Sequence, residues 1–346
     1  MTNSALDGKP YAGNPHVRID EGDGASAKPR RSSLLYNKTL MLIACTLGLM
    51  LSAGAGDPSK PAWIPREKGL FRSQVHRGGG GRYPDNALET FLWCWGHGCT
   101  PEADARLTKD GIAIAMHDNT LDRIGKDVDP KLKGVPAKDI FWDDIRRVDI
   151  GSKWGPQYAT YRIATMESVF AAMKGHPDRL LYLDEKGAPP AMMAEMAARY
   201  GVQEQTYYCS PNWRKVVEWR KHAPKGRSMV WLGNFPKDNS PANVAKTEAF
   251  VNARLDEMEK FGFAGIDQVQ IHVRTDRNQP DPFCPSTPFL KASVERLHKY
   301  GVSVNTVTWT HGDCEDLYFK LWDLGFDHFT TDYPETLFSV ISKLAR

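Results

Sequence analysis

The feature that most constrains the fold of this chain is a regular alternation of short apolar runs with helix-like segments from residue 71 onward. Eight runs have the length and composition of buried strands: 71–75, 99–105, 180–184, 206–209, 228–232, 265–271, 302–308 and 328–331. Helical patterns separate them at 87–95, 166–173, 190–200, 212–221, 241–261, 288–300 and 315–324. This alternation predicts an α/β fold of the (β/α)₈ barrel type.

Glycines directly before several predicted strands mark where the preceding helices end, as expected of the residue that follows a helix C-terminus. They are Gly96, Gly201, Gly262, Gly301 and Gly325.

The length of 346 residues accommodates either two domains or a single barrel of about 250 residues with extensions. The content of 41% hydrophobic and 25% charged residues is ordinary for a globular protein with a full core. Lys and Arg number 45 against 42 Asp and Glu, and no long basic block is present. We therefore do not expect a nucleic-acid partner.

The N-terminal part of the chain has a different character from the rest. Residues 1–38 are polar and lack periodicity, and an uncharged apolar run follows at 39–55. A basic flank, an apolar run and small residues at its end are typical of a secretory signal peptide, and an uncleaved membrane anchor is the alternative. We interpret 1–65 as a disordered N-terminus, signal peptide and linker, and 66–346 as the barrel of an exported protein, either periplasmic or secreted.

Five cysteines follow this leader: Cys94, Cys99, Cys209, Cys284 and Cys314. Their spacing matches no zinc motif. In an exported protein some cysteines form disulfides, and Cys284 and Cys314 follow consecutive predicted strands. Either these two form a bridge or all five are thiols.

Groups that carry chemistry are concentrated between residues 75 and 123. His76 and Arg77, then Glu102 and Asp104, then His117 each lie at or near the end of a short apolar run. In an α/β barrel such strand ends meet on one rim. The two acids are two residues apart, so on a strand their carboxylates point to the same side.

Carboxylates without soft ligands favour a hard cation, Ca²⁺ or Mg²⁺, although ion pairs with Arg106 or Lys109 would also satisfy Glu102 and Asp104. His76 and His117 suit proton transfer near neutral pH, and the alternative is a structural role in the core. A cation, two imidazoles and an arginine together suit attack on a phosphate ester.

The order and spacing of these motifs resemble those of the glycerophosphodiester phosphodiesterase family. The matching segments are His76-Arg77-Gly78, Pro84-Asp85-Asn86-Ala87, Glu102 to Gly111, His117 to Arg123, Thr308-Trp309-Thr310 and Thr331-Asp332-Tyr333-Pro334. The resemblance covers about 71–344 and implies a TIM barrel with a small insertion after the second strand. The stretch 118–161, which lacks the strand–helix rhythm, resembles that insertion.

The resemblance also implies roles for individual residues. The metal ligands would be Glu102, Asp104 and Asp184; strand parity agrees with Asp184, because it shares a face with Tyr182 whereas Glu185 does not. Three further residues would bind the substrate. Arg77 and Lys186 would contact the phosphate, and Trp309 would form a wall of the pocket.

Two other acids of these motifs receive structural roles at this stage. Asp85 is expected to cap the following helix. Asp332 is expected to brace neighbouring backbone rather than bind metal.

The implied function is metal-dependent hydrolysis of a small-molecule glycerophosphodiester to glycerol 3-phosphate and an alcohol. His76 and His117 would divide the acid and base roles, with His76 favoured as base and His117 as acid, and the nucleophile is either water or the substrate's own 2-hydroxyl. One alternative is a lipid-directed phosphodiesterase of the phospholipase D-like or sphingomyelinase D-like kind, with membrane contact through the loop at 281–285. The other is a barrel that binds a phosphorylated polyol without catalysis.

Overall fold

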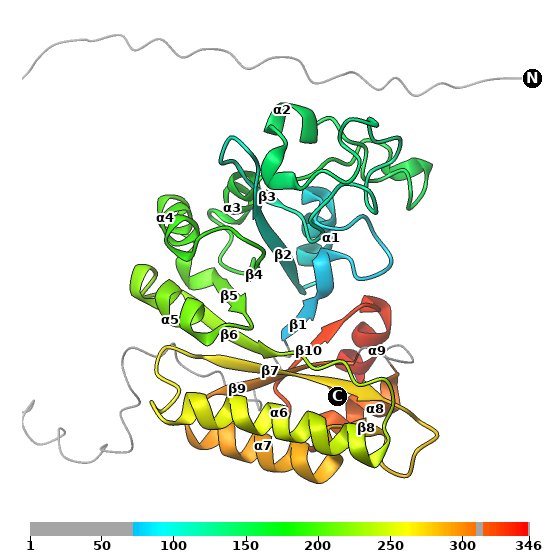
Figure 1. Ribbon diagram of the computed structural model, residues 1–346, viewed down its shortest axis with the longest axis vertical. Coiled ribbons are helices and arrows are strands. Elements are labelled where there is room, and N and C mark those ends of the chain that lie inside the picture. The colour runs from blue at the N-terminus through cyan, green and yellow to red at the C-terminus, as the bar shows by residue number, and fades with distance from the viewer. Residues whose placement is uncertain (1–71, 309–313, 345–346) are drawn as a thin grey trace, which may run out of the picture. The chain divides into compact units, whose positions relative to one another are not determined.

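The structure is a computed structural model that describes residues 72–308 and 314–344 (Figure 1). The predicted leader and Trp309 lie outside the described residues.

Eight parallel strands close into a barrel, as the alternation predicted. In order around the barrel they are β1 (Arg72–Val75), β2 (Thr100–Leu107), β4 (Leu181–Glu185), β5 (Thr206–Ser210), β6 (Arg227–Leu232), β7 (Gln268–Thr275), β9 (Ser303–Thr308) and β10 (His328–Thr331). Strand β1 pairs with both β10 and β2, which closes the sheet. Helices cover the outer face, so these strands are buried on both sides, and for that reason they appear in the sequence as short apolar runs (Figure 1).

The helices on the outside of the barrel begin and end within two residues of the predicted bounds. They are α1 (Leu88–Gly96), α3 (Met166–Met173), α4 (Pro190–Tyr200), α5 (Trp213–His222), α6 (Pro241–Glu259), α7 (Thr287–Lys299) and α8 (Glu315–Asp323). A further helix, α9 (Pro334–Leu344), was not predicted. None of the helices in the described ranges is long and apolar enough to cross a membrane.

One predicted helix end was wrong. Helix α1 runs through Gly96, and Gly98, with φ 71°, takes the left-handed conformation after it. Gly201, Gly262, Gly301 and Gly325 have positive φ at the predicted positions.

The segment between the second and third barrel strands, which carries α2 in Figure 1, has a small core of its own. It begins with the short strand β3 (Ala113–Ala115), antiparallel to β2, and contains α2 (Trp142–Ile145) and two 3₁₀ turns, η3 (Ala137–Asp139) and η4 (Pro156–Tyr158). Its buried apolar side chains include Leu121, Ile124, Ile140, Ile145 and Ile150. Strand β3 and the two-residue β8 (Phe283–Cys284), antiparallel to β7, were missed because each is too short to produce a pattern.

Part of the inside of the barrel below its rim is a buried polar network. The Asn305 amide on β9 donates to the side-chain oxygens of Gln74 (2.9 Å) and Gln268 (3.1 Å). Gln270 and Thr330 also donate to Gln74. Gln74 in turn donates to Glu102 on β2 at 2.5 Å, so this network connects β1, β7, β9 and β10 to the rim.

None of the five described cysteines forms a disulfide, so the Cys284–Cys314 bridge is not formed. The Cys284 sulfur lies 3.6 Å from the Thr247 hydroxyl, and the Cys314 sulfur lies 3.9 Å from the Arg277 guanidinium. The two loops thus aim their thiols at different neighbours.

Asn305→Ala should lower the free energy of unfolding by about 1–3 kcal/mol, because it leaves buried amide oxygens of Gln74 and Gln268 with fewer donors. Urea denaturation would measure this as a lower midpoint at an unchanged slope. The matched control is Asn278→Ala at an exposed position, for which we expect a change within about 0.5 kcal/mol. Equal effects of the two substitutions would contradict a structural role for the network.

Candidate active site

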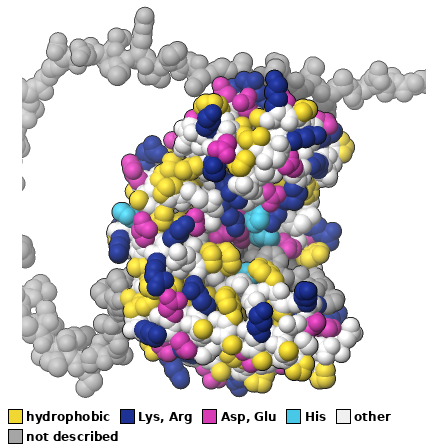
Figure 2. Space-filling view, in the orientation of Figure 1, with side chains coloured by type: hydrophobic (Ala, Val, Ile, Leu, Met, Phe, Trp, Pro, Cys, Tyr) yellow, Lys and Arg dark blue, Asp and Glu magenta, His cyan; other side chains and the backbone are white. Residues whose placement is uncertain are grey.

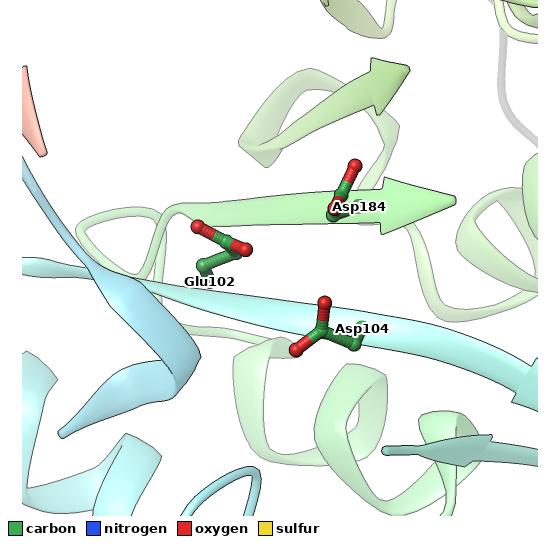
Figure 3. A group of neighbouring side chains, drawn as sticks. All are labelled: Glu102, Asp104 and Asp184. Atoms are coloured by element: carbon green, nitrogen blue, oxygen red, sulfur yellow. The ribbon is translucent and has the colours of Figure 1, made fainter. Parts of the chain in front are cut away.

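Three carboxylates converge at the barrel rim from two neighbouring strands. The parallel register of β2 with β4 places Asp104 opposite Asp184 and Glu102 opposite Tyr182. One ligand oxygen from each of Glu102, Asp104 and Asp184 lies within 4.8 Å of the others (Figure 3). All three side chains are buried, so the predicted acid set does come together.

Strand parity correctly separated Asp184 from its neighbour. The Asp184 carboxylate accepts hydrogen bonds from Lys186 Nζ (2.5 Å) and Trp231 Nε1 (3.0 Å) inside the rim. Glu185 points the other way, where it pairs with Lys215 at 2.9 Å.

Arg106, which could have paired with the acids, instead donates to the backbone oxygens of His117 and Lys186. It therefore ties together the two loops that carry those residues. This leaves Lys186 as the cation within 4.0 Å of the acid cluster in the described chain.

Asn86 holds Asp104 in place, a role that the sequence did not reveal. Its amide donates to Asp104 Oδ2 at 2.8 Å, and its side-chain oxygen accepts the backbone N–H of Asp104 at 3.0 Å. Asn86 has φ 56°, a left-handed conformation that Asn adopts more readily than most residues. Its position in the Pro84-Asp85-Asn86-Ala87 motif was the only available signal.

The chemistry of this cluster fits a hard divalent cation. Asp104 Oδ1 is buried and accepts no hydrogen bond from the described residues, with Lys186 Nζ as the neighbouring cation at 3.5 Å. Burial, together with the charges of Asp104 and Asp184, raises the pKa of Glu102 to about 7, and burial raises the pKa of Asp184. A cation bound by these oxygens would offset both the burial and the mutual repulsion, and oxygen-only donors are those that Ca²⁺ and Mg²⁺ prefer.

His76 is oriented by an acid from the far end of the chain. Its Nδ1 lies 2.7 Å from Asp332 Oδ1. Burial lowers the pKa of His76, but the hydrogen bond with Asp332 and the charge of Glu102 outweigh it, so the net shift is upward. Asp332 therefore positions an imidazole rather than backbone, which corrects the role expected from the sequence.

His117 is oriented in the same way by its neighbour Asp118, with Nδ1 2.8 Å from Oδ1. Burial is the largest effect and lowers the pKa of His117. The ring centroids of His76 and His117 are 6.3 Å apart, with the rings edge to face. Both predicted catalytic histidines thus lie side by side, each paired with a carboxylate.

A series of ion pairs links His117 to Arg77. Asp118 pairs with Arg123, Arg123 lies 2.6 Å from Asp85, and Arg77 lies 3.0 Å from the same Asp85 oxygen. The prediction that Asp85 caps the following helix was wrong: the N-terminal residue of α1 has no side-chain cap, and Asp85 holds two arginines instead.

One cavity of about 330 Å³ brings the predicted residues together, and we call it the catalytic cavity. Its wall includes His76, Arg77, Glu102, His117, Asp184 and Lys186. On this face, histidine side chains lie in a hollow bordered by charged groups (Figure 2).

Three aromatic residues of the same wall were not predicted. Trp231, near the end of β6, stacks on His272 with centroids 5.5 Å apart, and Phe235 makes an edge-to-face contact with His272 at 5.6 Å. Burial lowers the pKa of His272 to about 3, so this imidazole is neutral. The position of Trp231 near a strand end was a usable signal, whereas Phe235 lies in a loop without a pattern.

Comparison with known proteins connects this geometry with one family. Residues 76–336 match the model of the glycerophosphoryl diester phosphodiesterase family. A glycerophosphodiester phosphodiesterase from Caldanaerobacter subterraneus subsp. tengcongensis is 24% identical over 276 residues, 78% of this chain and 97% of that protein. Another from Bacillus subtilis is 26% identical over 297 residues, 77% of this chain and 93% of that protein.

Solved structures share the fold. A phosphodiesterase from Oleispira antarctica, in complex with the product sn-glycerol-3-phosphate, has a TM-score of 0.57 at 20% identity and covers 80% of this chain and 98% of its own. A glycerophosphodiester phosphodiesterase from Agrobacterium tumefaciens has a TM-score of 0.56 at 19% identity, with coverages of 78% and 100%. At such low identity these likenesses support the barrel fold alone.

Ca²⁺ or Mg²⁺ should raise the melting temperature of the wild-type protein, because a ligand of the folded state at about 100 times its Kd contributes about 2.7 kcal/mol. In Asp104→Asn the cation-dependent rise should be lost, and in the control Glu185→Gln, which faces away, it should remain. Thermal unfolding with and without cation measures the difference. A full rise in Asp104→Asn would place the cation elsewhere.

Proposed function

Because the chain belongs to the glycerophosphoryl diester phosphodiesterase family, we propose that it hydrolyses glycerophosphodiesters to glycerol 3-phosphate and an alcohol with the help of a divalent cation. The observation that carries this proposal is the convergence of two carboxylate-paired histidines and an oxygen-only acid cluster on one cavity. The glycerol 3-phosphate bound as product by the Oleispira protein supports the same product for this chain.

The cation would be held by Glu102, Asp104 and Asp184. When bound, it supplies Lewis-acid stabilisation of charge on a phosphoryl oxygen and lowers the pKa of a nearby hydroxyl. Asn86 and Trp231 keep two of the three carboxylates in place through the hydrogen bonds described above.

Arg77 and Lys186 would bind the phosphate. The Arg77 guanidinium matches two phosphate oxygens at once, and Asp85 fixes its orientation. Burial lowers the pKa of Lys186, but the charges of Asp184 and Asp104 raise it on balance, so the side chain is an ammonium at neutral pH. Trp309 stays a proposed wall of the pocket.

His76 and His117 would exchange protons with the attacking and leaving oxygens. Since a carboxylate lies at Nδ1 of each ring, Nε2 is the proposed reacting atom in both. The nucleophile is water or the substrate's 2-hydroxyl. The upward pKa shift of His76 and the downward shift of His117 by themselves favour His76 as the acid, the reverse of the order favoured from the sequence. A cation beside Glu102 would lower the pKa of His76 again. We therefore leave the acid and base roles of His76 and His117 to be assigned by the leaving-group experiment below.

Chelation should abolish turnover of glycerophosphocholine, and added Ca²⁺ or Mg²⁺ should restore it, because the acid cluster needs its cation. Phosphorus NMR of the reaction would identify glycerol 3-phosphate and any cyclic phosphate formed by the 2-hydroxyl. Full activity in excess chelator would remove the cation from the proposal. Binding without product would favour a non-catalytic barrel, and faster turnover of lysolipid micelles would favour the lipid-directed alternative.

His76→Ala and His117→Ala should each reduce kcat by at least about a hundredfold, the lower range for loss of a general acid or base. The matched control is His298→Ala, which removes a histidine paired with Asp327 at 2.8 Å outside the catalytic cavity. With the p-nitrophenyl ester of glycerol 3-phosphate, whose leaving group needs no proton, the variant that lacks the acid should recover most of its loss. A loss below tenfold for either histidine would refute its role.

A further inference from the structure

A second cavity, which we call the arginine cavity, opens beside the catalytic cavity. Its volume is about 560 Å³, and it shares His76 and Arg77 with the catalytic cavity. The remaining wall contains Arg82, Arg123, Trp154 and Tyr333. Since Arg77 is the proposed phosphate ligand, a group attached to the bound phosphate can extend from one cavity into the other.

Three separate segments build the arginine cavity. Gly80 (φ 58°) packs so closely on β10's end that a Cβ there would lie 2.4 Å from the Asp332 carbonyl oxygen. Gly81 donates its backbone N–H to that same oxygen at 3.0 Å, which fixes the glycine-rich loop against Asp332. Arg82 then lies over the Tyr333 ring, 5.3 Å from its centroid. Trp154 and Arg123 come from the segment with its own small core.

Arginines outnumber carboxylates on the wall of this cavity. It carries three arginines against two carboxylates, Asp85 and Asp332. Asp85 is shared between Arg77 and Arg123, Arg123 also pairs with Asp118, which is not part of the wall, and Asp332 pairs with His76. Within the described residues Arg82 has no carboxylate partner, and Arg77 Nε is buried without a hydrogen-bond acceptor. The unmatched donors therefore suit an anion better than a cation.

The sizes of the two cavities suggest which part of a substrate each would hold. The smaller catalytic cavity suits glycerol 3-phosphate, which all glycerophosphodiesters share. The larger arginine cavity suits the variable alcohol. We propose that it holds the alcohol and selects glycerophosphodiesters whose alcohol carries a second phosphate, in preference to a cationic alcohol such as choline; this inference rests on the proposed function.

Guanidinium groups recognise phosphate by charge and by paired hydrogen bonds. Choline could stack on Trp154 or Tyr333, but it would meet the like charge of Arg82. The long-range part of this selection is electrostatic, so it should weaken with salt.

The test compares kcat/KM for three soluble substrates. In bis(glycerophospho)glycerol the alcohol is a glycerol that carries a second phosphate, in glycerophosphoglycerol the alcohol is glycerol without that phosphate, and in glycerophosphocholine it is choline. The kcat/KM of bis(glycerophospho)glycerol is first divided by two, because this substrate has two equivalent scissile bonds. The result should exceed the kcat/KM of glycerophosphoglycerol at least about threefold, and glycerophosphocholine should have the lowest kcat/KM of the three. Arg82→Glu should lower the ratio of the first to the second about fivefold. The matched control Arg147→Glu changes an exposed arginine away from the cavity and should preserve the ratio.

The ratio isolates selection from catalysis, because a general loss of activity cancels in it. Turnover of all three substrates at equal kcat/KM, or an equal effect of the two variants, would overturn the inference and leave the proposed function standing. If none of the three substrates were turned over, both this inference and the proposed function would be overturned. Cardiolipin in detergent micelles supplies the same anion in acylated form, and its faster turnover would overturn the assignment to a soluble substrate.

Discussion

Burial of three carboxylates at one point of the barrel is the constraint on which the rest of the site depends. Unaccompanied, such charges would be costly, and the surrounding strands supply their partners. Gln74 donates to Glu102, Asn86 to Asp104, and Lys186 and Trp231 to Asp184. Each partner comes from a different strand or loop, so only the closed barrel assembles the set. The proposed chemistry therefore requires that the barrel be closed.

Much of this arrangement could be predicted from the sequence because it follows from local periodicity. Strand alternation placed Glu102 and Asp104 on one face and separated Asp184 from Glu185. The eight strands were recognised because burial on both sides makes them apolar. Elements of two or three residues, such as β3 and β8, leave no pattern, and their existence depends on the strand beside them.

The partners of the catalytic groups could not be predicted because they are distant in the chain. His76 and Asp332 are 256 residues apart, and Asp184 and Trp231 are 47 apart. The role of Asp85 was misjudged for a related reason. Its position before a helix indicated a cap, but Arg77 and Arg123 compete for the same carboxylate and offer charge-assisted bonds. Local rules fail where a charged partner arrives from elsewhere in the fold.

The ion-pair series from His117 to Arg77 has a consequence for how the protein loses function. Asp118 and Arg123 belong to a segment with a core separate from that of the barrel, so this segment can open while the eight strands remain paired. Such an opening would separate Asp118 from His117 and Arg123 from Asp85. Mild heating or limited proteolysis would then inactivate the enzyme before the barrel unfolds, and local unfolding of this segment would limit how long activity lasts.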